Sequence, residues 1–150
     1  MSLSARITRR TVRLLDALAE KFLPPEKRPS HQKTGRAGEE VAYFHLRELG
    51  YVMVARNYRS ARRRGEVDLI GWDDDVLCFV EVKTRTTHDV KPAEAAVDED
   101  KRRELAGMAR EYLRNLPKVQ QWRFDVVSVY MDDGDRARKL ELFKNAFSVS

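Results

Sequence analysis

The 150-residue chain has very little cysteine, because Cys78 is the only one. A single cysteine cannot form an internal disulfide, and it excludes zinc sites built from paired CxxC motifs. Cys78 lies inside an apolar run, so we interpret it as a buried thiol in a protein of the reducing cytoplasm. The three histidines are not spaced as metal ligands, and we interpret them as surface residues.

Long apolar runs are also lacking. No apolar stretch approaches the roughly 18 residues that a membrane span needs. The basic N-terminal segment has no continuous apolar core of a signal peptide. We therefore expect no membrane span, and the length and the 42% hydrophobic content favour one domain with a modest core.

The positive charge is concentrated at one end of the chain. Residues 1–36 contain 9 Lys/Arg and 3 Asp/Glu, a net +6, whereas residues 37–150 contain 20 and 21, a net −1, which together give +5. We predict a basic arm with a proline-containing linker over residues 1–33 and an α/β domain over residues 34–150. Apolar residues at near-helical spacing between Ile7 and Phe22 leave several roles open for the arm. It could pack on the domain, form a tail, contact nucleic acid or lie on a membrane surface.

Periodicity predicts the order helix, three strands, helix, strand, strand. The expected helices cover residues 35–49 and 98–116, and the expected strands include residues 51–58, 122–130 and 139–143. Between them, the stretch from Gly65 to Arg85 contains two apolar runs joined by three aspartates, which is typical of a hairpin. Charged residues interrupt both runs, namely Glu66 and Asp68 in the first and Glu81, Lys83 and Arg85 in the second.

These charges fall two residues apart, and such side chains share one face of a strand. If the register brings the two faces together, carboxylates and an ammonium group converge. Two carboxylates from neighbouring strands can hold Mg²⁺, which activates water for attack on phosphate. A chance triplet in a chain that is 35% charged, or a salt bridge from Asp68 to Lys83, would explain the same residues without catalysis.

The pattern Gly-Glu-x-Asp-Leu-Ile, a turn, and Phe-Val-Glu-Val-Lys-x-Arg resembles the PD-(D/E)xK nuclease superfamily. The similarity is closest to the small bacterial YraN-like family, which is similar to archaeal Holliday-junction resolvases. It extends from about Thr34 to Phe147, with Val67 where the superfamily has proline. Further matching segments are Gly35–Glu40, Arg56–Arg59, Arg123–Val127 and Asn145–Phe147.

The resemblance implies a restriction-endonuclease-like α/β fold, a mixed β-sheet flanked by helices. It implies a Mg²⁺- or Mn²⁺-dependent endonuclease acting on DNA, with branched or structured DNA as one candidate and a homodimer as one arrangement. Asp68 and Glu81 would hold the metal, Lys83 would assist the attacking water, and Glu39 would support them. Glu39 could instead complement the helix dipole. The alternative function is a module that keeps the fold and binds nucleic acid without catalysis.

Other residues are candidates for groups that support the metal ligands or bind the substrate. Glu66, Arg85 and Lys101 are expected beside the ligands, although Lys101 could equally lie on a solvated helix face. Asn57 and its neighbour Arg56 are further candidates, and Asp125 is either a supporting acid or a salt-bridged group. Four arginines before the hairpin either bind phosphate from a flexible loop or lie on a solvated, mobile loop without that role, namely Arg59, Arg62, Arg63 and Arg64.

Overall fold

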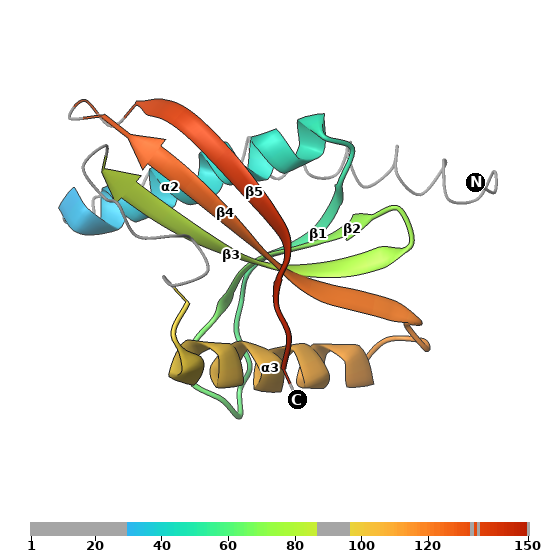
Figure 1. Cartoon of the computed structure of the whole chain (residues 1–150). Helices are drawn as coiled ribbons and strands as arrows, with labels where there is room; N and C mark the ends of the chain where they lie inside the picture. Colours follow the sequence, from blue (N-terminus) through green and yellow to red (C-terminus); the bar gives the residue numbers. More distant parts are fainter. Residues whose placement is uncertain (1–29, 87–96, 133, 135, 150) are drawn as a thin grey trace, which may run out of the picture.

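The computed structural model describes residues 30–86, 97–132, 134 and 136–149 (Figure 1). The first 29 residues of the predicted arm lie outside this set. The elements are α2 (Ser30–Glu48), β1 (Val52–Tyr58), β2 (Val67–Asp73), β3 (Val76–Thr86), α3 (Glu99–Arg114), β4 (Gln121–Met131) and β5 (Ala137–Phe147). Their order confirms the predicted succession of helix, three strands, helix and two strands.

The five strands form one mixed sheet in the order β1-β2-β3-β4-β5. Neighbouring strands are antiparallel except β3 and β4, which pair in parallel. Parallel pairing requires a crossover connection, and α3 lies between these two strands in the sequence. Figure 1 shows α2 and α3 on opposite sides of the sheet, so the predicted mixed sheet flanked by helices is confirmed.

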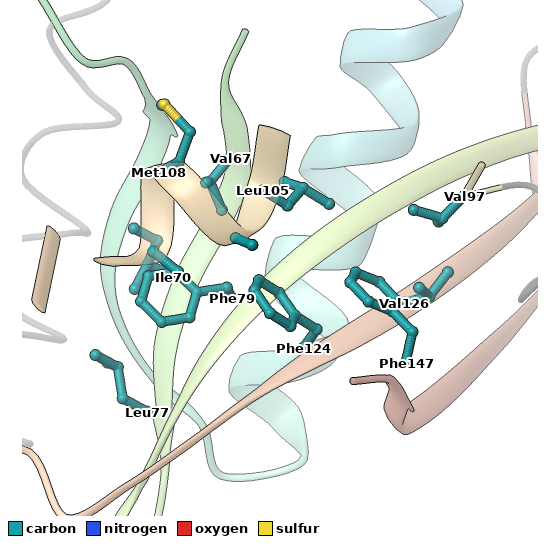
Figure 2. Packing of buried hydrophobic residues seen from close by; sticks show 12 residues of the cluster. Val67, Ile70, Leu77, Phe79, Val97, Leu105, Met108, Phe124, Val126 and Phe147 are labelled. Atoms are coloured by element: carbon teal, nitrogen blue, oxygen red, sulfur yellow. The ribbon is translucent and has the colours of Figure 1, made fainter. Parts of the chain in front are cut away.

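Each helix covers its own apolar core because the strand residues alternate between the two faces. Figure 2 shows the α3-side core, in which the rings of Phe124 and Phe147 stack at 4.8 Å with an interplanar angle of 11°. The α2-side core packs Tyr43 and Leu46 of the helix against strand residues such as Val80.

The β2–β3 hairpin has the tight turn that its sequence predicts. Asp73 pairs with Val76, and Asp74 has a left-handed backbone with φ 52°. Short two-residue turns of this kind favour aspartate because it tolerates positive φ.

Most boundaries differ from the prediction by one or two residues, and two differ by more. Helix α2 begins at Ser30, directly after Pro29, and not at residue 35. The prediction missed its first turns because they are polar and show no apolar period. Strand β5 extends to Phe147 because the Asn145 N–H donates to the buried Asp125 carboxylate at 2.9 Å. Asn145 has φ 51°, and this irregularity returns Phe147 to pairing with Phe124.

The described helices include none that is both long enough and apolar enough to cross a membrane.

Candidate metal centre

The candidate site lies where strands β2 and β3 stop pairing. The last pair of their ladder is Leu69 with Val80, and one further residue of the same register places Asp68 opposite Glu81. The Val82 N–H donates to Asp68 Oδ2 at 2.7 Å. The Asp68 side chain therefore accepts a strand N–H at the point where the ladder ends, and this bond fixes the carboxylate between the two strands.

Three carboxylates from two elements and a loop meet at this point. One oxygen each of Glu39 on α2, Glu66 before β2 and Asp68 on β2 lie within 4.8 Å of one another. Asp68 is only 7% exposed, whereas Glu39 and Glu66 are partly exposed. Burial, followed by the negative charge of Glu81, raises the pKa of Asp68 to about 8. A cation bound beside Asp68 would favour the ionised form of its carboxylate.

Glu81, a predicted metal ligand, lies outside this group of three but opposite Asp68, and it is 4% exposed. Lys83 Nζ lies 3.1 Å from Glu81 Oε1, and Lys101 Nζ of α3 lies 3.9 Å from Oε2. Within the described part of the chain, no donor makes a hydrogen bond to Oε2. A buried oxygen with lone pairs to spare fits a hard divalent cation, which binds oxygen ligands. Lys83 pairs with Glu81 and not with Asp68, so the simple salt bridge considered from the sequence is absent among these residues.

The residues expected to support the ligands are held in different ways. Arg59 pairs with Glu66 at 2.8 Å, although its side chain is 75% exposed. Lys101 donates to the Glu66 carbonyl at 3.4 Å as well as lying near Glu81. Arg85 is buried at 5% exposure, so its position is internal.

The arginine-rich loop is attached to α3 by two side-chain contacts. Ser60 Oγ donates to Glu111 at 2.6 Å, and Arg63 Nε lies 3.8 Å from the same carboxylate. Gly65 has φ 95°, and a Cβ there would collide with the Glu104 carboxylate. The loop thus contacts Glu104 and Glu111, two helix residues that sequence reasoning missed, since no local signal links them to the loop. Arg62 and Arg64 are exposed on it.

Asp125 belongs to a separate network at the other end of β2. Its carboxylate is fully buried and accepts hydrogen bonds from Arg123 at 2.8 Å and from Tyr51 at 3.2 Å. Arg123 also bonds Asp73 at 2.6 Å, and Lys144 bonds Asp73 at 2.8 Å. The salt-bridged interpretation of Asp125 is therefore confirmed, and this network is structural.

Fold and site together define a class: an α/β domain with a mixed five-stranded sheet and an acidic cluster suited to a metal ion. Residues 38–129 match the model of the uncharacterised protein family UPF0102. The chain belongs to this family.

Relatives from several bacteria support this assignment. A UPF0102 protein of Koribacter versatilis is 50% identical over 143 residues, covering 95% of this chain and 96% of the relative. Proteins of the same name from Solibacter usitatus and Pelotomaculum thermopropionicum are 45% and 40% identical, and each match covers 75% of this chain. They are covered over 84% and 93% of their lengths. A match over 95% of the chain must include most of residues 1–29, so the Koribacter versatilis protein shares much of the arm.

Proposed function

We propose that this protein is a metal-dependent endonuclease of the PD-(D/E)xK type that hydrolyses phosphodiester bonds of DNA, with branched or structured DNA as the candidate substrate. The observation that carries the proposal is the buried Asp68, fixed by the Val82 N–H among the oxygens of Glu39 and Glu66 and opposite Glu81. Several carboxylates gathered at one point suit Mg²⁺ or Mn²⁺, and the neighbouring Lys83 and Lys101 suit an anionic substrate.

The residues of the centre take different roles in this proposal. Asp68 and Glu81 hold the cation with support from Glu39, and Oε2 of Glu81 offers lone pairs that no described donor occupies. When bound, the cation supplies Lewis acidity towards phosphate and lowers the pKa of water. Lys83 is 32% exposed and fixed to Glu81, so its ammonium group can donate to a substrate phosphate or orient water while facing solvent.

The positive side chains around the centre provide the DNA contacts. Arg59 neutralises Glu66 in the free protein through an exposed pair, and exposed pairs contribute little to stability. DNA phosphate can therefore compete for its guanidinium group, while the loop's anchoring to α3 presents Arg62 and Arg64 at a fixed position. We further propose that the protein works in the cytoplasm and that two copies act together on the two strands of a substrate.

A cleavage panel of linear, nicked, flapped and four-way DNA with Mg²⁺ or Mn²⁺ tests the proposal. Wild type should cleave at least one substrate only with metal, and Asp68→Asn should cleave none. Lys118→Ala, at an exposed lysine of the loop before β4, is the control and should cleave like wild type. DNA binding without cleavage by wild type under all conditions would refute the nuclease and favour a non-catalytic binding module.

A further inference from the structure

The end of β1 has an irregular backbone that brings it to the acidic cluster. Asn57 has φ 47°, a left-handed conformation that asparagine adopts more readily than most residues. In a regular strand the side chains of Arg56 and Asn57 would point to opposite faces. Here both contact α2, because the Arg56 guanidinium lies 4.4 Å from the centre of the Tyr43 ring and Asn57 Nδ2 donates to Glu39 Oε2 at 2.9 Å.

The residues on either side of Asn57 hold it in place. Tyr58 packs edge-on against Tyr112 of α3 with the ring centres 5.0 Å apart. Arg56 meets α2 and Tyr58 meets α3, so the end of the strand is attached to both helices. Asn57 lies between these two attachments, and its exposed amide reaches Glu39 from there.

The chemistry of the contact distinguishes Glu39 from Glu66. In the described part of the chain, the Asn57 amide is the single hydrogen-bond donor to the Glu39 side chain. An amide carries no charge, so it orients the carboxylate without neutralising it, and it leaves the second oxygen for another partner. Glu66 is instead paired with the cationic Arg59.

We propose that Asn57 is a positioning residue of the metal centre, which fixes Glu39 as an oxygen ligand for a hard divalent cation. The inference rests on the proposed metal-dependent function. The inference explains the segment Arg56–Arg59, which is part of the resemblance to the YraN-like family. Asn57 orients one carboxylate, and its neighbours fix the end of the strand. Partners of this kind, one step removed from the ion, orient ligands and tune affinity.

Titration of the full chain with Mn²⁺ by calorimetry, without DNA, tests this role. Asn57→Gly keeps the left-handed backbone accessible and removes the amide. We expect it to weaken Mn²⁺ binding about 10- to 100-fold. Its melting temperature in EDTA should stay close to that of wild type. Asn145→Gly is the matched control, since Asn145 is likewise exposed and left-handed at φ 51° but bonds Asp125 through its backbone N–H, and it should bind Mn²⁺ like wild type.

A double-mutant comparison identifies the route of the effect. If Asn57 acts through Glu39, then Asn57→Gly should add nothing to the loss caused by Glu39→Gln. Wild-type Mn²⁺ affinity in Asn57→Gly would overturn the inference, whether or not Glu39→Gln weakens binding. Fully additive losses would overturn it too, because Asn57 would then act independently of Glu39. Unchanged Mn²⁺ affinity in Asp68→Asn would instead overturn the proposed metal centre itself.

Discussion

Replacing Asp68 with asparagine should stabilise the metal-free protein at alkaline pH, although the same change should abolish its activity. The pKa of Asp68 rises from 3.8 to about 8 through burial and the charge of Glu81. A raised pKa means that the folded state keeps a proton that the unfolded chain releases. The free energy of unfolding should therefore be unaffected below about pH 4 and fall by about 1.4 kcal/mol per pH unit up to pH 8.

The loss over this range is on the order of 5 kcal/mol as an upper limit. Asparagine keeps an oxygen that can accept the Val82 N–H and removes the ionisation. The asparagine variant should therefore lack this decline, so its advantage over wild type should grow from pH 5 to pH 8. Urea unfolding in EDTA at both pH values measures the difference. Added Mn²⁺ should stabilise wild type at pH 8 and leave the variant almost unchanged.

Asp98→Asn provides the control for this experiment. Asp98 also accepts a backbone N–H, from Lys101 at 2.8 Å, but it is an exposed N-cap where asparagine serves equally well. Its unfolding free energy should follow wild type at both pH values. If Asp68→Asn also ran parallel to wild type from pH 5 to pH 8, the reasoning about the buried carboxylate would be refuted.

Three further perturbations separate chemistry, binding and stability. Lys83→Ala should abolish cleavage while changing DNA affinity little, and equal cleavage by wild type and variant would point to a contaminating nuclease. Deleting residues 1–29 leaves α2 intact. If about three basic residues of this segment contact phosphate, the deletion should reduce the slope of log K for DNA binding against log salt by roughly three. An unchanged slope would show that the arm does not contact DNA. Phe147→Ala should cost about 3–5 kcal/mol in urea unfolding, because the ring is buried against Phe124. Leu49→Ala, at a side chain that is 53% exposed, should cost at most about 0.5 kcal/mol, and equal losses would contradict the packing argument.

The hairpin and its charged positions were predictable because their signals are local. Alternation within each strand and the short turn place Asp68 opposite Glu81 once the register is given. The anchoring of the arginine-rich loop was not predictable, since Ser60 and Glu111 are 51 residues apart in the sequence. The same holds for the extension of β5, which depends on the contact between Asn145 and Asp125. Contacts between distant polar side chains leave no period in the sequence, so they appear only in three dimensions.

The topology of the sheet also has a consequence for the order of folding. The four carboxylates of the centre lie between Glu39 and Glu81, within the segment α2–β1–β2–β3, whose strands pair as sequence neighbours. The parallel pair β3–β4, by contrast, joins Val76 to Gln121 and requires a long loop to close. Sequence-local pairings generally form faster than distant ones. We therefore expect β2 to pair with β3 before β4 joins the sheet, so that Asp68 and Glu81 are brought opposite each other early in folding.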